Sequence, residues 1–319
     1  EIITQIIERV EFENGIYRIF CSDLQRLARE KIIILKTATL AVDISASGTP
    51  STITIYGDTA VFPMYAHGAN YQDAPSQTVG YVKIGDEVFR YTTKPSSTTF
   101  GGTITRARFG TSQQEHKSGT SADTRQRKLV EEYFYWEGPA IKAIRALYTG
   151  FGGMPTHWHA GISTALINTA EWEGIGSDIY DTADDAKGVQ AYLAGLKNID
   201  AKTFVETELN KIAGVFQPVR GDGKLGLIRL TGIHQHAPSL GVLDERDAIS
   251  LSALKHQMHR VANICDVKWN YDDTVQKDYT RRNPVLDTTS SATHGKGTTK
   301  TLALRALHGS LHTQDTLNW

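Results

Sequence analysis

The sequence predicts a β-rich α+β fold built from several parts. Short runs rich in Val, Ile, Tyr and Thr, separated by turn residues, dominate the first 122 residues and the last part of the chain. Between them, apolar residues recur every three or four positions in stretches with helix start and stop signals. The 319 residues suffice for two or three domains.

The segment 1–45 is expected to open with a β-hairpin. Its turn is Asn14-Gly15, a pair that suits the positive φ values of a type I′ turn. A two-residue turn places apolar pairs on one face and an opposite-charge pair on the other. The predicted pairs are Phe12 with Tyr17, Val10 with Ile19, and Glu11 with Arg18.

A small all-β module is expected at about 48–122. A polar linker at 46–52 precedes it, and the region shows no helical period. Gly85-Asp86 separates two of its strands as a turn. The predicted strands are Ile53–Tyr56, Tyr81–Ile84, Glu87–Tyr91 and Thr103–Arg106. The module is therefore interpreted as an insertion in a larger domain.

The region 138–232 is predicted to be an α+β unit, and the region after it returns to strands. Its helices are expected from Pro139 to Gly150, over 184–198 and over 202–213, and a hairpin follows at 215–230. Beyond it, the sequence predicts a short helix within 244–260, an alternating strand at 261–271 and a loop at 286–300.

Composition narrows the classes of function. A net charge of −1 argues against a dedicated nucleic-acid binder, because neutralising phosphates needs an excess of Lys and Arg. No apolar run approaches the roughly 20 residues that span a bilayer. Cys21 and Cys265 are expected to be buried free thiols, since a disulfide framework would use more cysteines at closer spacing. Because the chain starts with Glu1, a fragment or processed product is expected.

Two histidine pairs are the best metal candidates: His157 with His159, and His234 with His236. Residues two apart in a strand point the same way, so each pair could chelate an ion. No carboxylate lies near the second pair in sequence, and nothing brings the two pairs together. A structural or surface role is therefore favoured over a metal site.

Two short glycine-containing segments have simple structural explanations. Arg220-Gly-Asp222 spells an adhesion tripeptide, but the same letters suit a hairpin turn. The segment 150–153 is glycine-rich, but it follows a helix, whereas a phosphate loop precedes one. A turn and a helix end are the favoured interpretations.

Acidic pairs and aromatic side chains are the remaining candidates. Facing carboxylates would suit a glycosidase, and exposed aromatic rings would suit sugar binding. The acids lie near helix starts or turns, however, and aromatic rings more often pack in a core. These residues are Glu131-Glu132, Glu171 with Glu173, Asp184-Asp185, Asp272-Asp273, Trp136, Trp158, Trp172 and Tyr133. No catalytic, cofactor-binding or metal residue is assigned, and an enzyme is not expected.

Three segments, 81–91, 103–111 and 116–120, resemble a small β module of phage tail and baseplate proteins. That module reads Ile-Gly-Asp-Glu at a strand pair, then Thr-Arg-Gly with a later Gly-Thr, then a His and a Gly. This chain has the same order but carries Ala107 where the module usually has Gly.

The rest of the chain is similar to tail hub proteins. The segment 141–153, Trp172, the helix predicted at 184–198 and the hairpin at 220–227 look like their middle α+β domain. The resemblance implies β-barrel-like hub domains, an inserted small all-β module and a central α+β domain. The implied ranges are 1–47 plus 123–137 for the first hub domain, 48–122 for the module, 138–232 for the α+β domain and 233–319 for the second hub domain.

The family implies a structural virion protein at the tail tip, assembled in the host cytoplasm. Its copies join into a ring, usually trimeric, that continues the tail tube channel. The implied partners are further copies, a distal tail or tube protein, the tape-measure protein, a fiber or spike protein, and DNA in transit. Two alternatives stay open: a carbohydrate-binding module for host adsorption and a tail-associated cell-wall hydrolase.

Overall fold

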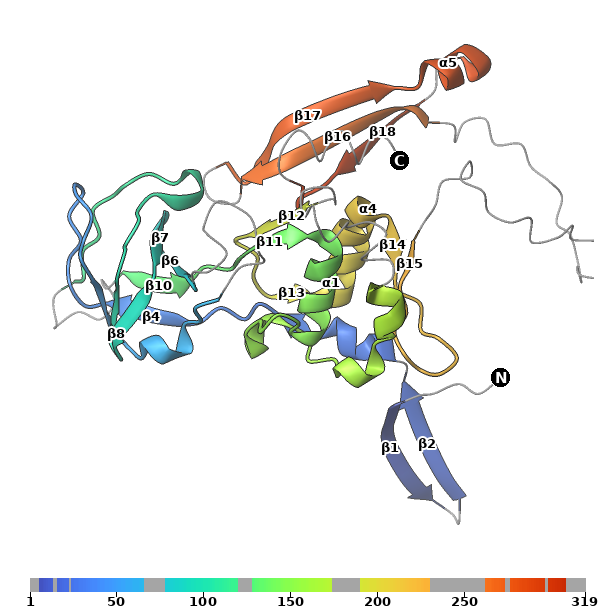
Figure 1. Ribbon diagram of the computed structural model, residues 1–319, viewed down its shortest axis with the longest axis horizontal. Helices are drawn as coiled ribbons and strands as arrows, with labels where there is room; N and C mark the ends of the chain where they lie inside the picture. The colour runs from blue at the N-terminus through green and yellow to red at the C-terminus, as the bar shows by residue number, and fades with distance from the viewer. Residues whose placement is uncertain are drawn as a thin grey trace, which may run out of the picture.

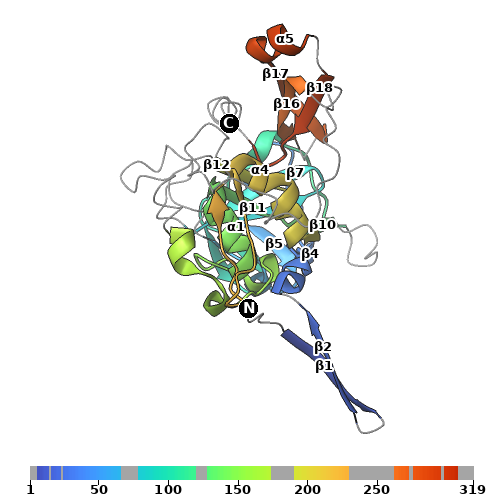
Figure 2. The same ribbon diagram turned by 90° about the vertical axis from the view of Figure 1, so that its right-hand side faces the viewer.

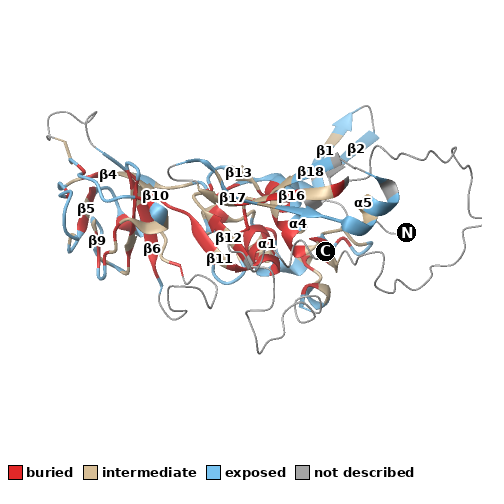
Figure 3. Ribbon diagram, turned by 90° about the horizontal axis from the view of Figure 1, so that it is seen from above, coloured by how far each residue is buried: buried red, intermediate tan, exposed pale blue. Residues whose placement is uncertain are grey.

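The computed structural model describes residues 6–13, 16–22, 24–65, 78–119, 128–173, 190–229, 262–272, 276–295 and 298–307. The fold is β-rich and of the α+β class, as predicted. Figure 1 shows a body of strands and helices from which two β elements project, one from each end of the chain. The buried residues concentrate in the body (Figure 3).

The N-terminal hairpin consists of β1 (Ile6–Glu13) and β2 (Ile16–Ser22). Its register confirms the predicted pairs Phe12–Tyr17, Val10–Ile19 and Glu11–Arg18. A bulge interrupts the ladder between Ile7 and Arg9. The hairpin projects from the body in both views (Figures 1 and 2), and none of its described side chains is buried.

Seven antiparallel strands form one sheet that curls into a half-barrel. The strand order is β7-β6-β10-β4-β5-β9-β8. The bounds are β4 Thr37–Leu40, β5 Ile53–Tyr56, β6 Gly80–Ile84, β7 Glu87–Tyr91, β8 Thr93–Ser96, β9 Thr99–Gly101 and β10 Leu129–Glu132. Leu40, Phe89, Phe100 and Val130 are among the residues of its buried cluster.

The central part packs helices and short strand pairs around the largest buried cluster of the structure. Its elements are β11 Tyr135–Pro139, α1 Ala140–Thr149, β12 Gln190–Ala194, β13 Ile199–Asp200, α3 Ala201–Phe204, the π-helical turn η7 Val205–Leu209, α4 Asn210–Ala213, β14 Val215–Phe216 and β15 Ile228–Arg229. Ile141, Ile144 and Leu147 bury one face of α1, which confirms the predicted first helix. The run α3–η7–α4 confirms the helix predicted at 202–213.

Short elements complete the body. β3 (Lys31–Ile32) pairs with β13, and Ala28 and Ile32 join the central cluster. The 3₁₀ turns are η1 Leu24–Arg29, η2 Thr59–Val61, η3 Arg108–Gly110, η5 Thr156–Trp158 and η6 Thr164–Leu166.

A three-stranded sheet ends the described chain and projects on the side opposite to the hairpin (Figures 1 and 2). β16 (Ala262–Asp272) lies between antiparallel β17 (Asp278–Leu286) and parallel β18 (Thr298–Ala303). The strand predicted at 261–271 is thus confirmed over 262–271. Val267 and Trp269 attach the sheet to the central cluster.

Two predicted segments are wrong where the structure describes them. Residues 190–194, predicted as the end of a helix over 184–198, form strand β12, in which Ala191 and Leu193 are buried on one face. The loop predicted at 286–300 contains helix α5 (Thr288–His294) and the start of β18. Asp287 caps α5, and its Oδ1 accepts a hydrogen bond from the Ser290 N–H at 2.8 Å. The helix was not predicted because its residues are polar and show no apolar period.

The sheet topology also bears on how the parts are divided. β4 and β10, from outside 48–122, lie in the same sheet as the strands of that module. The boundaries drawn at 47/48 and 122/123 therefore do not coincide with an edge of this sheet. Within the predicted strand 103–106, the pairing is a single bridge between Thr105 and Arg90. The helix predicted within 244–260 lies outside the described residues.

Candidate functional site

A buried ionic cluster is the most highly organised polar feature of the described chain. Glu87, the first residue of β7, accepts two hydrogen bonds from Arg106, from Nε at 2.8 Å and from Nη2 at 2.7 Å. His116 Nε2 lies 2.8 Å from the same carboxylate. The side chains of all three residues are buried. Such a paired and hydrogen-bonded arrangement is the condition under which a carboxylate is tolerated in a protein interior.

The same cluster ties together backbone segments that are distant in sequence. Arg106 donates to the carbonyl oxygens of Ser45, Gly48 and Gln114 at 2.6–2.9 Å. The backbone of His116 pairs in both directions with Ile44. One guanidinium therefore holds the segment 45–48 against the segment around Gln114.

Burial by itself raises the pKa of Glu87, but the hydrogen bonds from Arg106, His116 and the Gln114 N–H outweigh it. The pKa of this carboxyl consequently lies below its usual value. Glu87 is thus an ionised acceptor whose oxygens are occupied by donors of the chain. Such a group stabilises a fold; it does not offer an open position to a substrate.

The left-handed turn after Arg106 completes this region. Ala107 has φ 53° and ψ 42°, and Phe109 has φ 55°. The Phe109 ring packs among three tyrosines, with ring centroids 5.1 Å from Tyr81, 5.1 Å from Tyr133 and 4.7 Å from Tyr135. This aromatic group joins the half-barrel to the segment that leads into the central part.

The histidine pair at 157 and 159 does not form a chelating pair. The residues lie at a 3₁₀ turn rather than in a strand, and they have different partners. His157 Nε2 lies 3.0 Å from Oε2 of buried Glu132, which also accepts from the Lys36 N–H at 2.8 Å. His159 Nδ1 accepts from the Gly161 N–H. His234 and His236 lie outside the described residues.

The other sequence candidates occupy structural positions. Trp136, Trp158, Trp172 and Tyr133 are at most 4 % exposed, so they are not available for sugar binding in this structure. The turn at 220–223 and the helix end at Gly150 confirm their structural interpretations.

Among the described residues, the acidic pairs at 131–132 and at 171 and 173 have separate partners and do not form a facing pair of carboxylates. Glu132 points inward, whereas Glu131 contacts exposed Lys197 at 3.4 Å. Glu171 accepts from Arg220, and Glu173 lies 3.7 Å from Arg145. Asp184, Asp185 and Asp273 lie outside the described residues. Cys265 is a half-buried free thiol, and the side chain of Cys21 is outside the described part of the chain.

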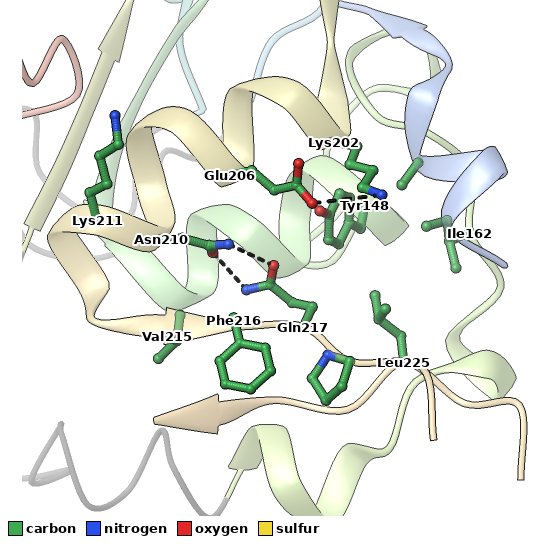
Figure 4. A pocket seen from close by; sticks show the side chains of 12 residues that line it. Tyr148, Ile162, Lys202, Glu206, Asn210, Lys211, Val215, Phe216, Gln217 and Leu225 are labelled. Atoms are coloured by element: carbon green, nitrogen blue, oxygen red, sulfur yellow. Dashed lines mark hydrogen bonds and ion pairs between the residues drawn. The ribbon is translucent and has the colours of Figure 1, made fainter. Parts of the chain in front are cut away.

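A cavity of about 560 Å³ opens beside α1, α4 and the β14–β15 hairpin (Figure 4). Four of its polar side chains form two pairs. Lys202 lies 3.6 Å from Glu206, and the side-chain amides of Asn210 and Gln217 form two hydrogen bonds, of 2.7 and 3.1 Å. Burial raises the pKa of the Tyr148 phenol at its edge, so the phenol stays protonated. We assign no ligand to this cavity.

Among the described residues, exposed large apolar side chains gather on the N-terminal hairpin. Five side chains of its one face are 53–69 % exposed: Ile7, Val10, Phe12, Tyr17 and Ile19. An apolar stripe of this kind marks an interaction surface in a protein that folds around a separate core. The sequence predicted this face but assigned it no partner within the chain, and the structure shows that the body does not cover it.

Neither a metal site nor a membrane helix is present in the part of the chain that the structure describes. Its His, Cys, Asp and Glu side chains form no group of three or more that could hold an ion. None of its helices has both the length and the apolar character needed to cross a lipid bilayer. A comparison with protein-family models finds no family that matches this chain, and a comparison with curated proteins finds no match either.

Proposed function

We propose that this chain is a structural protein of a bacteriophage tail tip. Its copies form a ring-shaped hub, expected to be trimeric, that continues the channel of the tail tube. In this role it contacts the distal tail or tube protein, the tape-measure protein and a fiber or spike protein, while DNA passes through the channel. The chain is assembled in the host cytoplasm, resides in the virion and catalyses no reaction.

The observation that carries the proposal is the buried cluster of Glu87, Arg106 and His116. These are the residues of the Ile-Gly-Asp-Glu, Thr-Arg and His segments on which the resemblance to phage tail modules rests. Arg106 and His116 both contact the carboxylate of Glu87, so the three segments meet at one buried point. The letters that carry the resemblance thus belong to residues that meet in space, and this supports the proposal.

The distribution of surface supports an assembly role. The hairpin projects away from the body with an uncovered apolar face, and Val285 and Leu286 of the C-terminal sheet are 39 % and 52 % exposed. A chain whose ends both carry projecting β elements has surfaces suited to neighbours on two sides.

The test is to locate the chain in phage particles. Electron microscopy of particles assembled from the encoding genome, with an antibody against this chain, should label one end of the tail. Reconstruction of that end should show a closed ring of copies around the channel. Label on the capsid or along the whole tube, or a chain absent from purified particles, would overturn the proposal.

A further inference from the structure

We infer that the apolar face of the N-terminal hairpin packs against the same face of a second copy of this chain. The inference goes beyond the proposed function, because a contact between like faces pairs two copies about a twofold axis and is therefore separate from the contacts that would close a trimeric ring. The partner surface is a two-stranded apolar ladder with the same length and twist, provided by residues 6–22 of the neighbouring copy.

The apolar stripe runs along the whole hairpin. Phe12 and Tyr17 lie near the tip with their ring centroids 4.7 Å apart, Val10 and Ile19 follow, and Ile7 lies near the base. All five side chains are more than half exposed. The stripe therefore faces water along its full length in a single chain.

The opposite face is mixed: it carries two ion pairs formed within the hairpin, beside Ile16 and Phe20, which are 63 % and 39 % exposed. Arg9 lies 3.1 Å from Glu11 and above the ring of Phe20 at 4.3 Å, and Arg18 lies 3.3 Å from Glu13. These pairs suit a face that remains in solvent. Because residues 6–22 carry three glutamates and two arginines, a net charge of only −1, identical hairpins can approach one another without a large charge repulsion.

The stability of hairpins argues that the stripe is covered. A single two-stranded hairpin is at best marginally stable in water, whereas strands with a shared apolar layer are stable. Two such faces pack as a two-layer sandwich with the sheets about 10 Å apart. Since a buried aromatic side chain contributes 150–250 Å², the five residues would bury on the order of 500 Å² per copy. A stable interface buries about 800 Å² per partner, so the hairpin supplies most of one.

A lipid bilayer suits this hairpin less well. Both outer strand edges carry unpaired backbone groups, which are strongly disfavoured in hydrocarbon. Insertion of the hairpin into the hydrocarbon would also bury its charged face. A second copy leaves the edges and charges in water and removes only the apolar stripe from it.

The first experiment compares two substitutions of equally exposed isoleucines in the full chain. Ile19 lies on the apolar face and is 58 % exposed, and Ile16 lies on the opposite face beside Glu13 and is 63 % exposed. Sedimentation equilibrium should show that Ile19→Lys weakens self-association at least tenfold, while Ile16→Lys changes it less than about twofold. Equal effects of the two substitutions, or none from Ile19→Lys, would overturn the inference.

The second experiment maps the contact directly. A photo-crosslinking amino acid at Tyr17 should join two chains, with the adduct inside residues 6–22 of the second copy. The same group at Arg18, on the solvent face, should give at least tenfold less of this adduct. An adduct within one chain, with another part of a second copy, or with added lipid vesicles instead of a second copy would overturn the inference.

The two proposals fail separately. Rings at the tail tip whose Tyr17 adducts map elsewhere would overturn the hairpin contact and leave the proposed function intact. Hairpin-to-hairpin adducts from a chain that is absent from tails would overturn the proposed function alone.

Discussion

At the scale of single residues, Ala107 occupies a backbone conformation that favours glycine. Its φ of 53° and ψ of 42° lie in the left-handed region, where a Cβ crowds the following carbonyl. Glycine adopts this conformation without that crowding, so Ala107 holds it at a cost in free energy.

Replacing Ala107 by Gly is expected to stabilise the protein. Relief of the left-handed strain is worth about 1–2 kcal/mol, and the added freedom of the unfolded chain offsets about 0.5–1 kcal/mol of it. The expected gain in the free energy of unfolding is about 0.5–1 kcal/mol, measured by urea denaturation. Gly110→Ala is the matched control: its φ is 76° and no atom crowds the new Cβ, so it should lose a similar amount. A loss of stability in Ala107→Gly would contradict the strain argument.

The buried Glu87 carboxyl makes stability depend on acid. Its folded pKa lies below the unfolded value of about 4.3, so its contribution is complete above that value. The contribution is lost as the pH falls through the folded pKa. We therefore expect the free energy of unfolding, measured by urea titration at a series of pH values, to fall below about pH 4.

Glu87→Gln should remove this acid dependence and lower stability at pH 7. A buried pair that loses one partner leaves an uncompensated charge, here on Arg106, at a penalty of about 3–5 kcal/mol. The same substitution at exposed Glu11, 3.1 Å from Arg9, should change the free energy of unfolding by less than about 0.5 kcal/mol. Comparable effects at the two sites would contradict the structural role of the cluster.

At the scale of elements, the β6–β7 hairpin depends on a glycine that lies under an aromatic ring. Gly80 pairs with Tyr91 across the two strands, and a Cβ at Gly80 would fall 2.2 Å from the Tyr91 ring. Tyr91 is fully buried and donates from its hydroxyl to the Pro63 carbonyl at 3.2 Å. Burial and this hydrogen bond therefore hold the ring in place.

Gly80→Ala is expected to lower the free energy of unfolding by about 1–3 kcal/mol through overpacking. Tyr91→Leu removes the ring and is destabilising by itself. In the double variant the clash is absent, so denaturant unfolding should show it to be more stable than the sum of the single effects by about 1–2 kcal/mol. Additive effects would mean that the ring and the glycine do not meet in solution.

Local sequence predicts the elements whose causes are local. The N-terminal register follows from Asn14-Gly15 and the alternation of side chains, and α1 follows from Pro139 and its apolar face. The segment 190–194 has apolar residues at spacings that also suit a helix, and it becomes a strand because β11, more than 50 residues earlier, pairs with it. β18 likewise depends on parallel pairing with β16, which no local pattern reveals.

The buried ionic cluster also depends on contacts between residues that are distant in sequence. Local sequence does not predict that Glu87, Arg106 and His116 meet. Arg106 is 19 residues and His116 is 29 residues from Glu87, and no spacing rule brings residues at these separations together. The histidine pair at 157 and 159 shows the converse. Their spacing suggests a chelate, but the 3₁₀ turn places their ring nitrogens on different partners.

At the scale of the whole molecule, the cores lie in the body. The three buried clusters include residues of the half-barrel, the central part and the base of the C-terminal sheet, but none from the described hairpin residues. Removing residues 1–23 therefore takes away no described core side chain. The hairpin is an appendage of an independently packed body (Figures 2 and 3).

This arrangement predicts how the melting temperature depends on concentration. If hairpins of separate copies cover one another, association stabilises the folded chain by mass action, and Tm rises with chain concentration. For a pair of chains, a hundredfold increase in concentration adds about 2.7 kcal/mol per pair, or about 1.4 kcal/mol per chain, which for a chain of this size corresponds to a rise of about 2 °C by calorimetry. A chain lacking residues 1–23 should melt at one temperature throughout, equal to that of the full chain at the lowest concentration. A truncated chain with the same concentration dependence would place the association on another surface, and one that melts far lower would show that the hairpin belongs to the folded body.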